Sequence, residues 1–255
     1  MFRLSALSAC VRFYASLVAI AVIFLALDAG AFVLRNLLPE GPRRRKLGRF
    51  WLYHVARFSV RFLHAMGILD CDLRELAAIR QESGLVLVAN HPSRLDSLIL
   101  AAALPRLVCV TKASIWERPT LGSTLRTAGY IRHDSLLKLI APATDSLKEG
   151  CQLLLFPEGT RSRAGAEPGP FQPGFAAIAQ RTHSAVQPIL IETDSPYLSQ
   201  GWPFLRRPPL PMRYKIRLAP RLPAPARDEA SGRILVETTE TLLKQGLTQT
   251  TLRDA

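Results

Sequence analysis

From residue 68 onward the chain alternates short apolar runs with stretches of helical periodicity. Short apolar runs bounded by turn residues are typical of buried strands, and they occur at 68–73, 85–89, 107–111, 129–131, 153–156, 186–191 and 212–218. Helical periodicity lies between them at 97–104, 121–128, 135–149, 174–182 and 229–245. Strands that alternate with helices predict an α/β fold in which a mostly parallel sheet is sandwiched by helices.

The N-terminal part of the chain has a different pattern. Residues 13–34 are largely apolar, interrupted by Ser16, Asp28 and Gly30, and a helix over this run is about 33 Å long, enough to cross a bilayer core. Asp28 lies near one end of the run, where an interfacial position tolerates a carboxylate. A basic linker follows, with Arg43, Arg44, Arg45 and Lys46, and Arg49 just beyond. The positive-inside rule then places the rest of the chain in the cytoplasm.

Residues 47–69 predict a second, amphipathic helix. Large apolar residues recur there at helical spacing, namely Phe50, Trp51, Val55, Phe58, Phe62 and Met66, with arginines elsewhere on its surface. This composition suits a helix that lies in the headgroup region, although a core helix of the globular domain has the same spacing. We therefore expect a membrane anchor over 1–69, a globular domain over 70–247 and a loose polar tail over 248–255. The pattern leaves open whether the anchor spans the bilayer or dips into one leaflet as a helix pair.

Composition narrows the classes of partner. Hydrophobic residues make up 48% of the chain and the formal net charge is +13, and such a balance suits nucleic acid, an anionic membrane or an acidic substrate. The basic residues beside the apolar segment favour the membrane, and the sequence lacks the motifs of nucleic-acid binders, so we expect no nucleic-acid partner. The four cysteines form no C-x-x-C pair and the histidines no metal-binding cluster, which favours buried free thiols and no metal site.

The first candidate chemistry follows the apolar run at 85–89. The sequence there is Asn90-His91-Pro92-Ser93-Arg94-Leu95-Asp96, and in an open α/β sheet ligands bind beyond the carboxyl ends of such strands. If Asp96 lies in the first turn of the next helix, its carboxylate can bond one nitrogen of His91 and leave the other free to take a proton. The alternative is that Asn90 or Ser93 only caps the helix and His91 is an ordinary polar residue.

A second motif follows the apolar residues 153–155, with the sequence Phe156-Pro157-Glu158-Gly159-Thr160-Arg161-Ser162. Together the two motifs resemble the glycerolipid acyltransferase family, the lysophospholipid and 1-acylglycerol-3-phosphate acyltransferases, in its bacterial PlsC-like form. Two weaker blocks match in order, Gly129-Tyr130-Ile131-Arg132 and the run 186–191 with Pro188. The resemblance covers roughly 68–218, and only the compressed block at Arg132 departs from the family pattern.

The resemblance implies an acyl transfer with defined roles for these residues. His91 would be the general base for an acceptor hydroxyl and Asp96 its orienting partner, so that no enzyme nucleophile is needed. Glu158, Gly159, Thr160 and Arg161 would form the acceptor site. Arg161 offers a fork of donors suited to phosphate, and Glu158 would bond an acceptor hydroxyl or hold Arg161. Arg132 is a second candidate for the phosphate.

The expected protein is a membrane-bound O-acyltransferase of the bacterial inner membrane, with its catalytic domain facing the cytoplasm. It would move a fatty acyl chain from acyl carrier protein or coenzyme A to a lysophospholipid, in the first place 1-acyl-sn-glycerol-3-phosphate, with no further cofactor. Because the block at Arg132 is compressed, a specialised acceptor such as an ornithine lipid or a lipid of a polyene or ketosynthase pathway is an alternative. A catalytically silent lipid-binding membrane protein is another.

Overall fold

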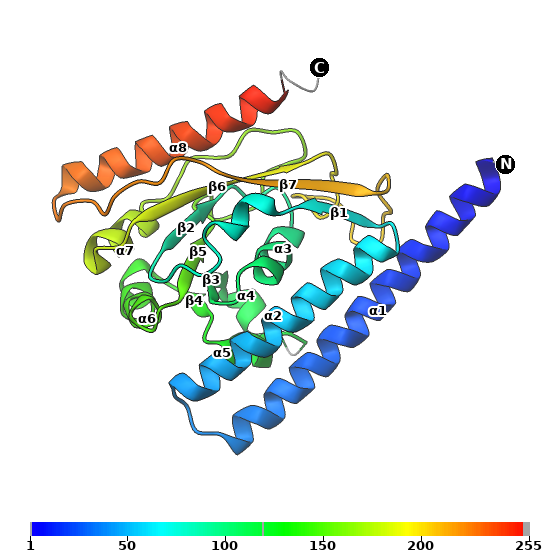
Figure 1. The fold of residues 1–255 in the computed structure, drawn as a ribbon, viewed down its shortest axis with the longest axis horizontal. Coiled ribbons are helices and arrows are strands. Elements are labelled where there is room, and N and C mark those ends of the chain that lie inside the picture. The colour runs from blue at the N-terminus through cyan, green and yellow to red at the C-terminus, as the bar shows by residue number, and fades with distance from the viewer. Residues whose placement is uncertain (1, 119, 252–255) are drawn as a thin grey trace.

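A seven-stranded sheet forms the centre of the computed structural model, which describes residues 2–118 and 120–251 (Figure 1). Its strands are β1 Leu69–Asp72, β2 Val86–Ala89, β3 Leu107–Lys112, β4 Ile131–His133, β5 Gln152–Leu155, β6 Val186–Thr193 and β7 Met212–Leu218. They are ordered β1-β7-β6-β2-β5-β3-β4. All neighbours pair in parallel except β6 and β7, which are antiparallel. The mostly parallel sheet expected from the sequence is thereby confirmed.

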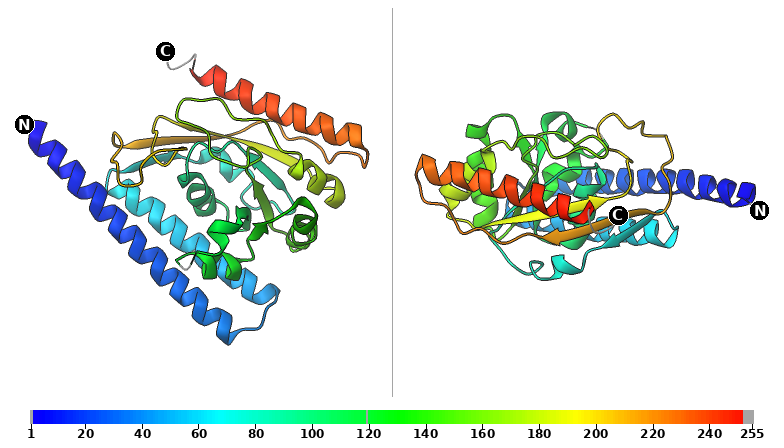
Figure 2. Two further views of the ribbon diagram at one scale, coloured as in Figure 1. Left: turned by 180° about the vertical axis from the view of Figure 1, so that it is seen from behind. Right: turned by 90° about the horizontal axis from the view of Figure 1, so that it is seen from above.

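Helices cover both faces of this sheet (Figures 1 and 2). They are α1 Phe2–Leu37, α2 Pro42–Ala65, α3 Leu95–Ala103, α4 Ala113–Trp116, α5 Gly122–Ala128, α6 Leu136–Lys148, α7 Gly174–Thr182 and α8 Glu229–Thr251, with a short 3₁₀ helix η1 at Arg74–Ala77. One apolar core joins the sheet to α2, α3 and α5. The other joins it to α6, α7 and α8. The central strands β2 and β5 are therefore buried on both faces, which is why their sequences are apolar almost throughout. Strand β7 instead alternates buried and exposed residues.

Besides shifts in the bounds of single elements, the secondary structure differs from expectation in the following ways. The basic segment predicted as a linker is the first turn of α2, because Pro42 suits the start of a helix and Arg and Lys favour helix formation. Helix α8 continues to Thr251, so residues 248–251 are helical and the expected tail is shorter; residues 252–255 lie outside the described part. The one-turn elements α4 and η1 were not predicted, since they are too short to show a period.

Helix α1 packs along the globular domain. Phe13 is buried in the core, and the Asp28 carboxylate accepts a hydrogen bond of 2.7 Å from the backbone N–H of Thr124 at the start of α5. Its outer face exposes apolar side chains along most of its length, among them Leu7, Val11, Val18, Val22, Leu25, Phe32 and Val33. By length and composition, Leu7–Leu37 is the one stretch of the described chain that suffices to cross a membrane. Asp28 is thus a docking residue, and the helix presents one face to the domain and the other to its surroundings.

Candidate active site

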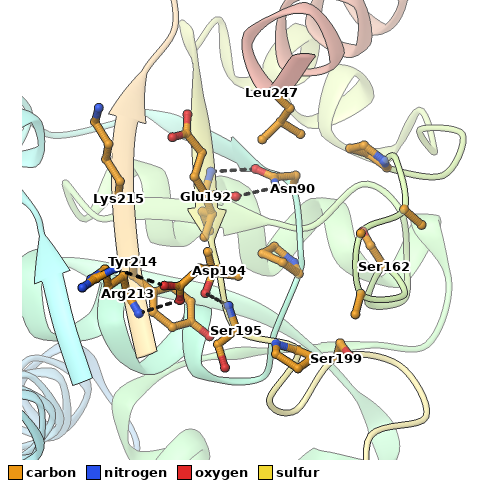
Figure 3. A pocket seen from close by; sticks show the side chains of 18 of the residues that line it. Asn90, Ser162, Glu192, Asp194, Ser195, Ser199, Arg213, Tyr214, Lys215 and Leu247 are labelled. Atoms are coloured by element: carbon orange, nitrogen blue, oxygen red, sulfur yellow. Dashed lines mark hydrogen bonds and ion pairs between the residues drawn. The ribbon is translucent and has the colours of Figure 1, made fainter. Parts of the chain in front are cut away.

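The His91 loop leaves the end of β2 and is fixed to β6 by Asn90. The side-chain amide of Asn90 donates to the carbonyl oxygen of Ile191, and its Oδ1 accepts from the backbone N–H of Ile191, both at 2.8 Å (Figure 3). These two bonds continue the pairing of β2 with β6 by one residue after β2 has ended. The backbone therefore enters the loop in a fixed position. One alternative was that Asn90 caps α3. The structure contradicts it, because the Asn90 side chain bonds the backbone of Ile191 in β6.

His91 and Asp96 meet as the sequence predicts. His91 Nδ1 lies 2.8 Å from Asp96 Oδ2, and the same oxygen accepts a 2.9 Å bond from the backbone N–H of Ser93. Asp96 is fully buried in the first turn of α3. Burial raises its pKa, while the hydrogen bonds from His91 and from Ser93 N lower it. Because the carboxylate accepts from Nδ1–H, the lone pair of His91 is on Nε2, where it can take a proton.

The ring of His91 is held from its face by Phe156. The two rings are stacked, with centroids 3.9 Å apart and planes 15° apart. Phe156 directly follows β5, the strand that pairs with β2, so the strand ends bring the two motifs together. A ring fixed at its edge by Asp96 and at its face by Phe156 has one orientation, which general-base catalysis requires. The sequence placed Phe156 in the motif but gave it no role.

Glu158 joins the two loops through backbone groups. Its Oε1 accepts from the backbone N–H of His91 at 2.8 Å, and its Oε2 accepts from Ser162 Oγ at 2.7 Å and from Gly169 N–H at 3.2 Å. Neither oxygen bonds Arg161. The hypothesis that Glu158 holds Arg161 is therefore wrong for this structure, since adjacency of β2 and β5 places its carboxylate beside His91 instead.

Gly159 and Thr160 form the turn that follows Glu158. Gly159 has a φ of 64°, a left-handed conformation that costs a glycine little, and its N–H donates to the carbonyl oxygen of Phe156 at 3.1 Å. Thr160 is exposed and has no side-chain hydrogen bond among the described residues. Further along, Ser162 N–H donates to the carbonyl oxygen of His91 at 2.9 Å, which ties the end of the turn back to the His91 loop.

Arg161 lies beside the dyad and is anchored on one side. Its Nη1 donates to the carbonyl oxygen of Ser199 at 2.9 Å and to that of Leu198. Burial and the nearby Arg94 lower its pKa, and the charge of Asp96 acts in the opposite direction. In the described part of the chain, Nη2 and Nε make no hydrogen bond. One edge of the guanidinium is thus fixed by backbone carbonyls, and the other edge keeps donors that suit an anionic group.

Arg132 is placed elsewhere. It lies in β4, at the edge of the sheet and three strand positions from β2, which corresponds to about 14 Å at the usual spacing of strands. Its guanidinium bonds Asp134 at 2.6 Å and Glu117 at 2.9 Å. The structure brings His91, Asp96, Glu158 and Arg161 together and leaves Arg132 outside this group. Lys112, at the end of β3, is exposed.

Ser93 is a structural residue of the loop. Its hydroxyl donates to the carbonyl oxygen of Tyr197 at 2.8 Å and accepts from the backbone N–H of Leu95 at 3.2 Å, and its side chain is fully buried. A hydroxyl bonded in this way is not presented as a nucleophile. The role of Tyr197, like that of Asn90, depends on contacts between distant parts of the chain, and the sequence carried no signal for it.

A cleft of about 1630 Å³ lies beside the two loops (Figure 3). Asn90, Pro92 and Ser162 contribute to its wall on the side of the loops, and Arg213 and Tyr214 of β7 line the opposite side. Asp194 on its floor accepts a 2.9 Å bond from the backbone N–H of Arg213. Neither His91 nor Asp96 lines this space. The cleft therefore flanks the His91 loop on the side of β6 and β7.

Comparisons with known proteins agree with this geometry. The Acyltransferase family profile matches residues 71–192, which include the dyad and the loop of Glu158 and Arg161. The chain is similar to the 1-acyl-sn-glycerol-3-phosphate acyltransferase of Pseudomonas aeruginosa, with 28% identity over 189 residues that cover 70% of this chain and 72% of that protein. It is 31% identical over 112 residues to the enzyme of the same name from Helicobacter pylori, covering 42% of this chain but only 47% of the relative.

A solved structure supports the fold over the whole length. The 1-acyl-sn-glycerophosphate acyltransferase PlsC of Thermotoga maritima superposes with a TM-score of 0.70 over 98% of each chain, at 20% sequence identity. At this identity the likeness shows the fold alone. The profile match, the similar sequences and the paired His91 and Asp96 lead to one assignment: residues 71–192 form a domain of the acyltransferase family.

Proposed function

We propose that this protein transfers a fatty acyl group from a thioester, of acyl carrier protein or coenzyme A, to the free hydroxyl of 1-acyl-sn-glycerol 3-phosphate, giving phosphatidic acid. The observation that carries the proposal is the His91–Asp96 pair, which lies at a strand end and is joined by Glu158 to the loop of Arg161. The names of the similar proteins support the same acceptor.

The reaction requires no enzyme nucleophile. His91 Nε2 removes the proton of the acceptor hydroxyl as its oxygen attacks the thioester carbonyl carbon, and Asp96 stabilises the resulting imidazolium. The tetrahedral intermediate then collapses, a C–O ester bond replaces the C–S bond, and His91 returns the proton to the leaving thiolate. Ser93 takes no part, because its hydroxyl is bonded to Tyr197. The fixed ring orientation given by Phe156 and Asp96 serves both proton transfers.

Arg161 is the residue we assign to the acceptor phosphate. A guanidinium that is held on one edge by the carbonyls of residues 198 and 199 presents its other donors at low entropic cost. Gly159 and Thr160, in the open turn just before it, would contact the glycerol backbone. Glu158 acts through His91 and Ser162, so we assign it a positioning role in place of acceptor binding. Arg132, which is held by Asp134 and Glu117, is the least favoured member of the set.

The apolar outer face of α1 supports a place at the membrane. Side chains such as Val18 and Val22 are more than half exposed, and lipid is the environment in which such a face is stable. Arg43 to Lys46 in the first turn of α2 favour the cytoplasmic leaflet of a bacterial inner membrane. Because Asp28 docks α1 onto α5, we favour an α1–α2 pair that lies in one leaflet over a lone spanning helix.

The test is an acyl-transfer assay with the full chain purified in detergent. Labelled acyl thioesters of both donor classes are offered with a panel of lysolipids, including lysophosphatidic acid and a lyso-ornithine lipid. Labelled phosphatidic acid should form with wild type and with the control His183→Asn, which changes an exposed histidine at the end of α7. It should fall on the order of 10³-fold with His91→Ala. A product with another headgroup, or a product that persists in His91→Ala, contradicts the proposal.

A further inference from the structure

A turn between β6 and β7 exposes two large apolar side chains. The backbone N–H of Arg206 donates to the carbonyl oxygen of Pro203 at 3.0 Å, so Phe204 and Leu205 occupy the centre of a closed turn. Their side chains are 55% and 65% exposed. The centres of turns usually carry Gly, Asn, Asp or Ser. An ordered turn that presents Phe and Leu to the outside therefore marks a contact surface.

This turn is continuous with the exposed face of α1. The hydroxyl of Tyr14 donates to the carbonyl oxygen of Leu205 at 3.0 Å, and Tyr14 lies between Val11 and Val18 on the exposed side of the helix. Figures 1 and 2 show that the connection between β6 and β7 lies beside α1 where its N-terminal turns project beyond the domain. Lipid that covers α1 at Tyr14 must therefore also reach Phe204 and Leu205.

The residues around the turn have the composition of a membrane interface. The guanidinium of Arg206 lies over the ring of Trp202, 4.7 Å from its centroid, and Trp202 Nε1 donates to the carbonyl oxygen of Arg206 at 3.0 Å. Arg207 follows directly. Tryptophan and arginine are enriched at the level of lipid headgroups, where the ring is half-buried and the cation contacts phosphate. Two cations next to an apolar tip favour a bilayer with anionic lipid as the occupant.

The same segment is rigidly joined to the active site. Tyr197 Oη donates to the carbonyl oxygen of Phe204 at 3.2 Å, and the carbonyl of Tyr197 accepts from Ser93 Oγ. The carbonyls of Leu198 and Ser199 hold Arg161. A short chain of hydrogen bonds therefore links the tip of the turn to the His91 loop and to the proposed phosphate ligand.

We propose that the 203–206 turn is a second membrane contact, inserted into the same leaflet as α1, and that the lipid acceptor passes along it from the bilayer to Arg161 and His91. The second part rests on the proposed function. The turn sets the height of the His91 loop above the lipid, so that a lysolipid presents its phosphate and hydroxyl without leaving the leaflet. As a consequence, the protein should prefer a lysolipid in a membrane over the same lysolipid in solution.

Insertion is tested without any activity measurement. The variant Phe204→Trp is mixed with vesicles of phosphatidylcholine and phosphatidylglycerol, with or without dibrominated lipid. The tryptophan fluorescence that this variant adds to wild type should be about half as strong in the vesicles that contain bromine. Ile234→Trp is the matched control, since Ile234 is 61% exposed on α8, across the sheet from α1; its added signal should not be quenched. The insertion is contradicted if the signals of Phe204→Trp and Ile234→Trp are quenched equally, or if neither is quenched.

Acceptor entry is tested with Phe204→Ser/Leu205→Ser in the full chain. With lysophosphatidic acid in vesicles, KM should rise about tenfold while kcat stays within twofold, which corresponds to about 1.4 kcal/mol of lost binding. With a short-chain lysophosphatidic acid below its micellar concentration, both constants should match wild type and Ile234→Ser. An equal loss with both substrates indicates only a structural role and overturns acceptor entry. If wild type itself makes no phosphatidic acid, the proposed function fails while the quenching result still decides insertion.

Discussion

Two aspartates are buried in this chain, and the unfavourable burial of a carboxylate serves a different purpose at each. Asp96 at the active site and Asp28 in α1 are both almost inaccessible, with exposed fractions of 0% and 3%. Each accepts a backbone N–H near the start of a helix, from Ser93 before α3 and from Thr124 in α5. Burying a carboxylate is unfavourable unless its oxygens are hydrogen-bonded, so each position must have a reason to retain it.

The difference lies in what else each carboxylate contacts. Asp96 also bonds the imidazole of His91, so in the proposed mechanism its charge acts on the proton transfer. Asp28 bonds a backbone amide in the contact of α1 with the domain, where Thr127 Oγ also donates to the carbonyl oxygen of Ala31 at 3.3 Å. In the proposed mechanism the first aspartate serves the chemistry, whereas the second fixes an apolar helix to the domain. Substitutions at the two positions should separate activity from stability.

The largest effect is expected for Asp96→Asn. The oxygen of the amide would still accept from His91 Nδ1–H and from Ser93 N–H. It carries no negative charge, so the imidazolium that forms when His91 takes the proton loses its stabilisation. We expect kcat to fall on the order of 10³-fold, with KM for lysophosphatidic acid within twofold. Steady-state kinetics measure this, and circular dichroism controls for folding. A kcat within tenfold of wild type would remove the distinction between the two aspartates.

Glu158→Gln should have an intermediate effect, because Glu158 acts on His91 through its backbone. Glutamine can still accept from His91 N–H, but its NH₂ group would face Ser162 Oγ and Gly169 N–H, both of which are donors to Glu158. We expect kcat to fall about 30-fold through misplacement of the loop. Ser162→Ala, which removes one donor and leaves no donor clash, is the matched control and should lose less than fivefold. An effect confined to KM would return Glu158 to the acceptor site.

Asp28→Ala should change stability and leave the chemistry intact. The Thr124 N–H loses its acceptor in a buried contact, which lowers the free energy of unfolding by about 1–3 kcal/mol. Amide hydrogen exchange at Thr124 should become faster, whereas Asp28→Asn, which keeps an acceptor oxygen, should retain most of the protection. The kcat measured in detergent should stay within twofold for both variants. A large loss of kcat in Asp28→Ala at a temperature where the protein is folded would show that docking of α1 also shapes the site.

The strands and the motifs of the site could be predicted from the sequence, but most contacts between the motifs could not. The central strands β2 and β5 were recognisable because both of their faces are buried, and the pairing of His91 with Asp96 is local enough to follow from one helical turn. The bond of Glu158 to His91 joins residues far apart in sequence and exists because β2 and β5 are neighbours, an order that no apolar run encodes. The same holds for Asn90 with Ile191 and for Tyr197 with Ser93. Asp28 was interpretable only as a cost until α5 was placed beside it.

Arg132→Gln should have the smallest effect of the series, and it tests the one site residue that the structure sets apart. Arg132 bonds Asp134 and Glu117 at the exposed edge of the sheet, and such surface pairs contribute little to stability. Because β4 lies about 14 Å from β2 at normal strand spacing, a lysophosphatidic acid bound at His91 would not bring its phosphate to this side chain. KM and kcat should both stay within twofold of wild type, whereas Arg161→Gln should raise KM at least tenfold. A comparable rise for Arg132→Gln would mean that the acceptor phosphate reaches β4 and that Glu117 and Asp134 release the guanidinium when it binds.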